Sequence, residues 1–382
     1  MKVAVLATDT REHFKDYANP TPNFGTAPQA LLQGFAALPE LEVHVISCAQ
    51  KPMRSPEKIA PNIWFHSLHV PKIGWMRTGY QGCIRAIRRA LRSIKPNLVH
   101  GQGTERECAI GAVLSGFPNV ITVHGNMRLI AQVNKARPFS FGWLAARLER
   151  FTLPRSVGVV CITNYTRDAV LGLARRTWVI PNAVDASFFE VNPKLPQDGV
   201  PKILCVGHVW PRKNQNAFIR ALDPLAEKAK FRLVFLGQTN SGRAYDDEFL
   251  SLVRARAWCE QPGFADREAL KKELLSASLL ALPSLEDNCP MVVLEAMAAG
   301  VPVVAAKVGG LPDLIEEDVT GWFCDPLSAE SMRRAVQGAL ANPAAAAEMA
   351  ARAKARARQK FHPEIIGRRH LQIYQEVVTT PS

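Results

Sequence analysis

The sequence predicts an α/β protein made of two Rossmann-like, doubly wound parallel-sheet domains. Short β-branched runs alternate with helical stretches along the chain, which is typical of parallel sheets. A chain of 382 residues is longer than one hydrophobic core usually supports. Residues 182–201 are rich in Asn, Pro and Asp and weakly patterned, which indicates a linker between two sets of strands. We therefore expect domains over residues 1–186 and 187–360, and a C-terminal helical segment over 361–382 that packs back towards the first domain.

The sequence also predicts individual helices and strands. The Ala-rich run 335–358 is expected to be helical, since Ala and Arg are strong helix formers, and residues 364–378 are expected to form one last helix. The expected strands of the first half are Lys2–Ala7, Glu42–Ser47, Ile63–Leu68, Asn97–His100, Asn119–His124, Val157–Ile162 and Trp178–Pro181. Those of the second half are Lys202–Val206, Arg232–Leu236, Leu279–Leu282 and Val301–Ala305.

Composition limits the kinds of protein that this chain can be. Hydrophobic residues make up 47% of the chain, and no apolar run approaches the ~18 residues that a membrane span needs. The first apolar run is too short for a signal peptide and fits a buried strand better. The cysteines show no C-x-x-C spacing, so no zinc site is indicated, and most fall in apolar runs as buried free thiols do. A reducing cytoplasmic location is the default expectation.

Positive charge is concentrated in the first half. The net charge is +13, and residues 1–185 carry 23 Lys and Arg against 11 Asp and Glu. No acid occurs between Glu57 and Glu105. Within this window Ile84, Ile87, Leu91 and Ile94 recur at helical spacing and predict an amphipathic helix with a basic face. The arginines of this surface are Arg77, Arg85, Arg88, Arg89 and Arg92.

Three interpretations of these arginines remain open. Docking on an anionic membrane surface is one, because each basic residue near such a surface contributes about 1 kcal/mol. A solvated helix in a basic protein is the second. Nucleic acid binding is the least supported, because no recognised binding motif accompanies the charge, and we expect no nucleic acid partner. The apolar stripe of the helix is expected to face the core.

Two carboxylates mark the most informative stretch of the chain. Asp287 lies in the turn after the strand 279–282, and Glu295 lies eight positions later on the helix that follows. Pro290 is well placed to open that helix, since the N–H that it lacks would be unpaired there. A helix N-terminus beside a turn is an anion site. The layout suits a phosphorylated sugar compound, and the alternative is an ordinary strand–turn–helix with solvated acids.

Glycines follow several expected strands, where they allow close backbone approach to a ligand. Gly207 and Gly237 do so in the second half. Arg212 and Lys213 follow Gly207, where a cation can meet a pyrophosphate leaving group. In the first half, His100 and His124 each close an apolar run before a glycine, although a lone strand-end histidine is more often structural. The dehydrogenase G-x-G-x-x-G and the P-loop are both absent, which argues against a nicotinamide enzyme and a P-loop kinase.

The ordered set of motifs resembles the family 4 (group 1) retaining glycosyltransferases from end to end. That resemblance implies the GT-B arrangement, in which two Rossmann-like domains face a central cleft. Asp287 and Glu295 match the two acids of the family's E-x7-E segment, with Asp in the first place. The other matching pieces are residues 23–28, 98–101, 121–125, 161–167, 180–185, 206–214, 261–264 and 309–313 with Gly321.

The resemblance also implies roles. Glu295 would bind the ribose hydroxyls of a nucleotide sugar, Asp287 the hydroxyls of the donor sugar, and Lys213 the leaving diphosphate. His124 would lie near the donor sugar, and Gly25 would let the N-terminal loop approach it. His124, Lys213 and Asp287 are thus the expected catalytic residues, with no metal and no cofactor. The expected donor-binding residues are Gly25, Gly207, His208, Arg212, Lys213, Gly237, Asp287, Asn288, Pro290, Met291, Val292 and Glu295.

Three departures from the family pattern bear on the donor. His208 stands where the family usually has Arg, so one diphosphate contact is weaker or depends on pH, and Arg212 can compensate. Asp287 is one methylene shorter than Glu, which moves its carboxylate and bears on the preferred sugar. Residues 288–290, Asn-Cys-Pro, replace the common G-F-G, and Pro290 cannot donate a backbone N–H.

The expected function is retaining, metal-independent transfer of a sugar from a UDP-, GDP- or ADP-sugar. The expected acceptor is a polysaccharide, a lipopolysaccharide or a lipid-linked glycan. The expected location is cytoplasmic and peripheral on the inner face of the membrane. Two alternatives remain: a nucleotide-sugar-binding protein with little catalysis, and a different GT-B enzyme such as a phosphorylase or an epimerase.

Overall fold

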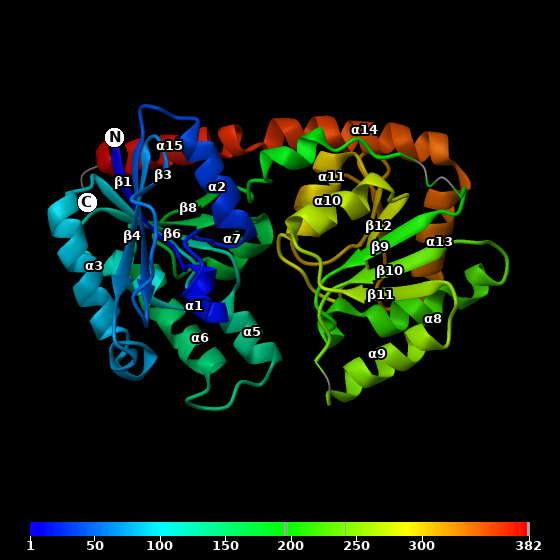
Figure 1. The fold of residues 1–382 in the computed structure, drawn as a ribbon, viewed down its shortest axis with the longest axis horizontal. Coiled ribbons are helices and arrows are strands. Elements are labelled where there is room, and N and C mark those ends of the chain that lie inside the picture. The colour runs from blue at the N-terminus through cyan, green and yellow to red at the C-terminus, as the bar shows by residue number, and fades with distance from the viewer. Residues whose placement is uncertain (195, 197, 241, 380–382) are drawn as a thin grey trace. The chain divides into compact units, whose positions relative to one another are not determined.

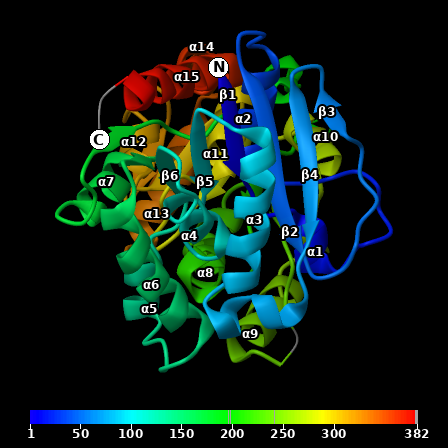
Figure 2. The same cartoon turned by 90° about the vertical axis from the view of Figure 1, so that its left-hand side faces the viewer.

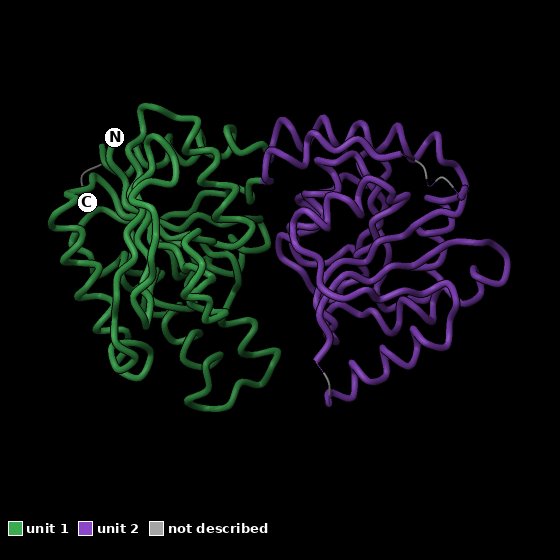
Figure 3. The backbone as a smooth tube through the Cα atoms, viewed as in Figure 1, with its two compact units in different colours: residues 1–183, 362–382 green, residues 184–361 purple. Residues whose placement is uncertain are grey.

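The structure, a computed structural model, describes residues 1–194, 196, 198–240 and 242–379. These residues form two compact units (Figure 3). Unit 1 comprises Met1–Ala183 together with His362–Ser382, and unit 2 comprises Val184–Phe361. Residues 195 and 197 of the expected linker and 380–382 of the expected C-terminal segment lie outside the described residues. Each unit is an α/β structure around its own sheet, which confirms the predicted fold class (Figure 1).

The sheet of unit 1 has the strand order β3-β4-β2-β1-β5-β6-β7-β8 and is parallel except for the β3–β4 pair. Its strands are β1 Lys2–Leu6, β2 Glu42–Ala49, β3 Lys58–Ala60, β4 Ile63–His69, β5 Leu98–Gln102, β6 Asn119–Val123, β7 Gly158–Cys161 and β8 Thr177–Val179. Its α-helices are α1 Thr10–Phe14, α2 Thr26–Ala36, α3 Gln81–Ile94, α4 Glu107–Val113, α5 Met127–Val133, α6 Phe141–Thr152, α7 Asn164–Val170 and α15 Pro363–Thr379. Short 3₁₀ turns are η1 Lys72–Gly74, η2 Met76–Thr78 and η3 Leu153–Arg155.

The buried strands of unit 1 send alternate side chains to opposite faces of the sheet. Val3 and Val5 of β1 belong to the core beneath α2 and α15, whereas Ala4 and Leu6 belong to the core beneath α3 and α4. This alternation follows from the two-residue period of a strand. Figure 2 shows α3 crossing in front of the strands of this unit.

The C-terminal helix belongs to unit 1 because it packs closely on α2. The contact is between glycines: a Cβ on Gly34 would lie 2.1 Å from the carbonyl oxygen of Pro363, and one on Gly367 would lie 2.9 Å from Gly34. Glycine costs helix stability, but here it permits the backbones to approach. Tyr374 of α15 is fully buried in the same core.

The sheet of unit 2 is parallel with the order β11-β10-β9-β12-β13-β14. Its strands are β9 Lys202–Val206, β10 Arg232–Leu236, β11 Cys259–Gly263, β12 Leu279–Leu282, β13 Val303–Ala306 and β14 Trp322–Cys324. Its α-helices are α8 Gln215–Ala226, α9 Ala244–Arg254, α10 Arg267–Leu275, α11 Met291–Ala299, α12 Leu311–Leu314, α13 Ala329–Ala341 and α14 Pro343–Lys360. Two 3₁₀ turns are η4 Ala186–Glu190 and η5 Pro211–Lys213.

The structure confirms one expectation about local structure and corrects another. The Ala-rich run 335–358 is helical as predicted, and it forms parts of two helices, because α13 ends before Asn342 and α14 begins at Pro343. Asn342 caps α14 by accepting from the backbone of Ala345, and proline favours the first helical position. The expected linker is also partly a core segment, since Phe188 and Phe189 of η4 are buried at 0% and 3% exposure.

Candidate active site

The predicted donor-binding residues of unit 2 lie where the order of its sheet reverses. Strand β9 is the first strand of the unit and lies between β10 and β12 in the sheet. From β9 the chain continues to β10 on one side, whereas from β12 it continues to β13 on the other side. Ligands in open α/β sheets bind beyond the carboxyl ends of the strands at such a point. Gly207, His208 and η5 follow β9, whereas the turn containing Asp287 and then α11 follow β12.

Lys213 and Asp287 form an ion pair at this edge. The Nζ atom of Lys213 lies 2.5 Å from Oδ2 of Asp287, and the hydroxyl of Ser284 donates to the same oxygen at 3.1 Å. The guanidinium of Arg212 lies 3.7 Å from the other oxygen, Oδ1, and donates to the backbone carbonyl of Glu286 at 2.6 Å. The site therefore holds two cations beside one buried carboxylate.

The backbone around Asp287 is held by a glycine that cannot be replaced without movement. The carbonyl oxygen of Asp287 accepts from the N–H of Gly310 at 3.0 Å. A Cβ on Gly309 would lie 1.9 Å from that oxygen, and Gly309 has a left-handed φ of 54°. The Gly309-Gly310 pair thus fixes the turn that presents the carboxylate.

Glu295 is a buried carboxylate in the middle of α11. The helix is apolar on nearly all sides, and Glu295 is only 5% exposed within it. Burial raises the pKa of Glu295 to about 7, with Arg267 acting to lower it and Asp185 to raise it. Arg267 and Asp185 are themselves paired, with Nη1 and Oδ2 2.5 Å apart. Glu295 is therefore poised to accept hydrogen bonds from hydroxyl groups and to change charge near neutral pH.

The two glycines at the strand ends of unit 2 have different roles. A Cβ on Gly237 would lie 2.0 Å from the carbonyl oxygen of Gly207, so Gly237 is required by close packing of the chain on itself. A Cβ on Gly207 would lie 3.5 Å from Lys213, an ordinary contact, although its φ of 149° is unfavourable for other residues. Both glycines were expected to leave room for a ligand. At Gly237, close packing against the backbone of Gly207 is a second reason for glycine.

The remaining predicted residues of unit 2 surround the turn and the start of α11. The side chain of His208 is exposed, while its carbonyl accepts from Gln215 at 3.1 Å. Pro290 is buried and directly precedes the helix, as predicted. Asn288 and Met291 are half-buried, and Val292 is 9% exposed.

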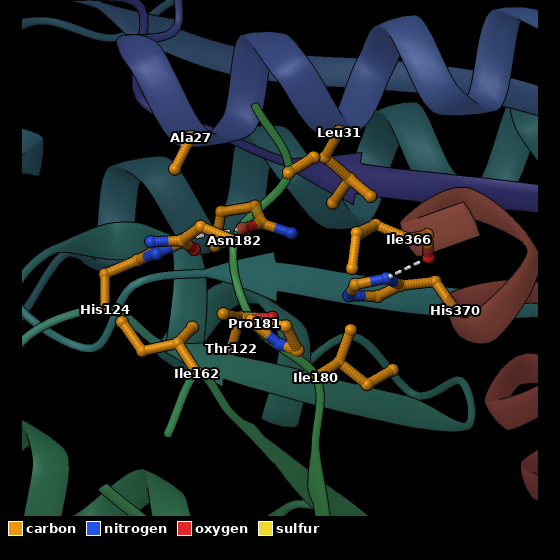
Figure 4. Close-up of a pocket in the computed structure, with 12 residues that line it drawn as sticks. Ala27, Leu31, Thr122, His124, Ile162, Ile180, Pro181, Asn182, Ile366 and His370 are labelled. Carbon is orange, nitrogen blue, oxygen red and sulfur yellow. Dashed lines mark hydrogen bonds between the residues drawn. The ribbon is translucent and has the colours of Figure 1, made fainter. Parts of the chain in front are cut away.

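His124 lines a small pocket of unit 1 directly after β6 (Figure 4). Its Nε2 atom donates to Oε1 of Gln102 at 2.8 Å, so the protonated nitrogen faces Gln102. Burial lowers the pKa of His124 to about 4, while a hydrogen bond to Asn182 acts to raise it. His124 is therefore neutral at physiological pH, with a tautomer set by Gln102. The lining residues are Ala27, Leu31, Gln102, Thr122, His124, Ile162, Ile180, Pro181, Asn182, Ala183, Ile366 and His370.

His100 does not close its strand, contrary to expectation. It lies inside β5, which continues to Gln102, and it is fully buried. One ring nitrogen lies 2.6 Å from the hydroxyl of Tyr374 and the other 2.7 Å from that of Thr122. Burial holds its pKa well below the usual range. His100 is a structural residue that joins α15 to the sheet.

Gly25 precedes α2, the helix whose residues Ala27 and Leu31 line the pocket of His124 (Figure 4). It has a left-handed φ of 78°, and the side chain of Asn23 accepts from its N–H at 2.9 Å. Gly25 therefore stands at the start of a helix that lines this pocket, without lining it itself.

The predicted basic surface is a helical face of unit 1. The arginines at 77, 85, 88, 89 and 92 are exposed. The apolar stripe of α3, which includes Ile84 and Leu91, packs into the core as expected. In the described part of the chain, no helix is long and apolar enough to cross a membrane.

Several residues of both sites were not assigned roles from the sequence. Gln102 and Arg267 contact side chains distant in the chain, whereas Ser284 contacts Asp287 within the same turn. Asn182 and Asp185 lie within the matching piece 180–185, and the resemblance implies no role for either residue. For Gln102 the available signal was its place two residues after His100, which puts both on one face of a strand.

Both halves of the chain match known protein families. Residues 29–188 match the family described as Glycosyltransferase Family 4, and residues 188–360 match the family described as Glycosyl transferases group 1.

Characterised relatives cover most of the chain. The 2-deoxystreptamine glucosyltransferase of Streptomyces kanamyceticus is 26% identical over 84% of this chain and 86% of its own length. A glycogen synthase of Mycobacterium tuberculosis is 29% identical over 74% of this chain and 69% of its own length.

Solved structures share the fold. Sucrose-phosphate synthase of Thermosynechococcus elongatus has a TM-score of 0.76 at 21% identity, covering 99% of both chains. HepE of Anabaena, solved with UDP-glucose, has a TM-score of 0.71 at 17% identity, covering 98% of this chain and 100% of its own. These likenesses confirm the predicted two-domain glycosyltransferase fold.

Proposed function

Because this chain belongs to the family 4, group 1 glycosyltransferases, we propose that it moves a sugar from a nucleotide-diphosphate donor with retention of anomeric configuration. The proposed acceptor is a cell-surface polysaccharide, a lipopolysaccharide or a lipid-linked glycan. The observation that carries the proposal is the group at the sheet edge of unit 2, where Lys213 and Arg212 lie beside Asp287 and where α11 carries the buried Glu295. The likeness in fold to HepE, which was solved with UDP and with UDP-glucose, supports a nucleotide sugar as the donor.

Cations and carboxylates hold different parts of the donor. Lys213, Arg212 and the N-terminus of α11 supply positive charge to the diphosphate, so that no metal ion is required. The carboxylate of Glu295 accepts hydrogen bonds from the ribose hydroxyls. Asp287 accepts hydrogen bonds from hydroxyls of the donor sugar, and it exchanges its contact with Lys213 for these when the diphosphate takes the lysine.

The transfer itself exchanges one bond for another at the anomeric carbon. The bond from that carbon to the diphosphate oxygen breaks, and a bond to the acceptor oxygen forms. The acceptor hydroxyl gives its proton to the departing phosphate oxygen. The protein stabilises the separated oxocarbenium and pyrophosphate charges, mainly through Lys213, and needs no side-chain nucleophile.

His124 is assigned to the donor sugar. As a neutral imidazole, it contacts the donor sugar without adding a charge to the site. Gln102 holds its ring. The arginines of α3 are assigned to an anionic membrane or to an acidic acceptor, in a cytoplasmic protein that associates peripherally with the inner membrane face.

Thermal unfolding with UDP, GDP, ADP and their sugars tests the proposal first. A ligand at ~100 times its dissociation constant adds about 2.7 kcal/mol, which shifts the midpoint by a few degrees. We expect one nucleotide to stabilise the chain with or without a chelator. Sugar transfer to an acceptor, assayed with that donor, then separates catalysis from binding alone. A requirement for inorganic phosphate would instead indicate a phosphorylase, and donor isomerisation without acceptor would indicate an epimerase.

A further inference from the structure

The helical hairpin made by α5 and α6 carries an unusual group of exposed side chains. Val133 is 77% exposed and Phe139 is 80% exposed, and both lie at the tip of the hairpin. Ile130 and Phe141 are 39% and 48% exposed on the helices beside them. Side chains this apolar gain nothing from water, and a group of them marks an interaction site. We call this group, with the cations described next, the hairpin surface.

Every exposed charge on this hairpin is positive. No Asp or Glu occurs between Glu107 and Glu149, whereas Lys135, Arg137 and Arg147 are exposed. Among the described residues, no carboxylate lies within ion-pair distance of Lys135 or Arg137. Apolar side chains surrounded by cations therefore face solvent together.

The single acid of the hairpin is used to anchor its base. Glu149 is fully buried and accepts from the backbone N–H of Met127 at 2.9 Å and from the hydroxyl of Thr104 at 2.8 Å. It also pairs with Arg128 at 3.3 Å. The anchor holds α5 and α6 together at the base of the hairpin. Figures 1 and 2 both show the connecting loop at one end of unit 1, beyond the sheet.

The loop between the helices contains two residues with unfavourable backbone conformations, and one of them is its aromatic residue. Phe139 has a φ of 62° and Lys135 a φ of 45°, both in the left-handed region. A bulky aromatic in that region is a rare outlier. The Phe139 ring contacts Trp143 at 5.2 Å between centroids, and Arg147 lies over the Trp143 ring at 4.0 Å. Strained backbone positions of this kind cluster at ligand clamps and other functional sites.

We propose that the hairpin surface docks on an anionic lipid bilayer, with Val133 and Phe139 inserted among the acyl chains. Lys135, Arg137 and Arg147 then meet the lipid phosphates, which is the pattern of interfacial membrane segments. Isolated valine and isoleucine side chains favour hydrocarbon and offer little to a nucleic acid backbone. This surface is separate from the arginines of α3 and does not depend on the proposed reaction.

Docking has a consequence for the site of unit 1. Helix α5 begins at Met127, three residues after His124, so the hairpin surface and the His124 pocket share one segment of chain. If the proposed function holds, a docked hairpin keeps this pocket near the membrane, which suits a lipid-linked acceptor.

Co-sedimentation of the full chain with vesicles tests the proposal. We expect binding to phosphatidylcholine vesicles that contain phosphatidylglycerol, with weak binding to pure phosphatidylcholine and a loss of binding as salt rises. The double variant V133Q/F139Q should bind at least about tenfold more weakly. Phe14→Gln is the matched control, because Phe14 is an aromatic of the same unit with 71% exposure. Both variants alter exposed side chains, so an unchanged unfolding midpoint verifies the fold.

Three outcomes would overturn the proposal. Wild-type vesicle binding by V133Q/F139Q is the first. A loss of binding in R88Q/R92Q that exceeds the loss in V133Q/F139Q is the second, because it would assign docking mainly to α3. A change in the oligomeric state with V133Q/F139Q, measured by light scattering without vesicle binding, is the third and would identify a second copy as the partner. Nucleotide stabilisation reports on unit 2 separately, so failure of docking is distinguishable from failure of the proposed reaction.

Discussion

Lys213 and Asp287 are paired directly, with Nζ and Oδ2 2.5 Å apart, although the resemblance assigns the lysine to the diphosphate and the aspartate to the sugar. Their side chains are 17% and 11% exposed, so the pair is mostly shielded from water. A donor that binds both residues must replace this contact with two others. The pair therefore links recognition of the sugar to recognition of the diphosphate.

Replacing Lys213 with Ala should lower kcat about 10²–10³-fold, because it removes a contact that strengthens as charge develops on the leaving group. The control is Lys307→Ala, which removes an exposed lysine of the same unit that pairs with Glu317 at 2.7 Å. That control should keep wild-type kcat. Steady-state kinetics with the identified donor measures both, and equal turnover in the two variants would remove Lys213 from the mechanism.

Asp287→Asn should separate the sugar from the nucleotide. We expect the nucleotide sugar to bind about tenfold more weakly, because an amide is a poorer acceptor than a carboxylate for sugar hydroxyls. The nucleoside diphosphate should bind as well as before or better, since Lys213 loses its partner. Calorimetric titration of both ligands gives the ratio. A parallel loss of both affinities would contradict the assignment to the sugar.

Glu295 should make stability and donor binding depend on pH in opposite directions. Its pKa of about 7 lies above the ordinary 4.5, so the folded state holds a proton that the unfolded chain releases. Ionising this buried group therefore costs stability as pH rises from about 4.5 to 7, by about 3 kcal/mol in total. Glu295→Gln should be more stable than wild type at pH 8 and similar at pH 4.5, as measured by denaturant unfolding.

The same carboxylate should bind the donor best when ionised. Nucleotide affinity is expected to rise between pH 6 and 8 in the wild type, because the charged form is the stronger acceptor for ribose hydroxyls. Glu295→Gln should bind weakly and without this rise. A variant that kept the wild-type pH dependence would place the titrating group elsewhere.

Gln102 should act through His124. Gln102→Leu removes the acceptor of the His124 Nε2–H bond, and we expect kcat to fall about tenfold while the KM for the donor changes little. Gln102→Glu restores an acceptor and adds a charge that raises the pKa of His124, so activity should partly return and gain a new titration above pH 4. Thr122→Val, which removes a partner of His100 instead, is the control. Identical pH profiles in all variants would make Gln102 merely structural.

Gly237 should tolerate no side chain. Gly237→Ala places a Cβ 2.0 Å from the carbonyl of Gly207, and we expect it to cost about 3 kcal/mol of unfolding free energy and to weaken nucleotide binding. Gly338→Ala is the matched control inside α13, where nothing lies within 4 Å of the new Cβ. It should add about 1 kcal/mol, because alanine favours helix. Urea unfolding compares the two, and a stable Gly237→Ala protein would contradict the packing argument.

The strands missed by sequence reasoning share one property. In the described chain, β3, β11 and β14 all lie at the edges of their sheets. Edge strands bury less surface and so need no long apolar run, and β11 even contains Pro262, which edges tolerate. The central strands β9, β10 and β12 were predicted with the bounds that the structure shows, because strands buried on both faces must be continuously apolar.

The sequence by itself determined the α/β class, the two domains of the fold and the family, because these depend on local patterns and on the order of motifs. It also located Asp287 and Glu295, since the turn and helix that carry them are local. Tertiary structure alone decided the pairing of Lys213 with Asp287, the burial that raises the pKa of Glu295, and the contact of Gln102 with His124. These join residues far apart in the chain or depend on what surrounds a group. No local pattern records which side chains meet when strands from distant segments are brought together.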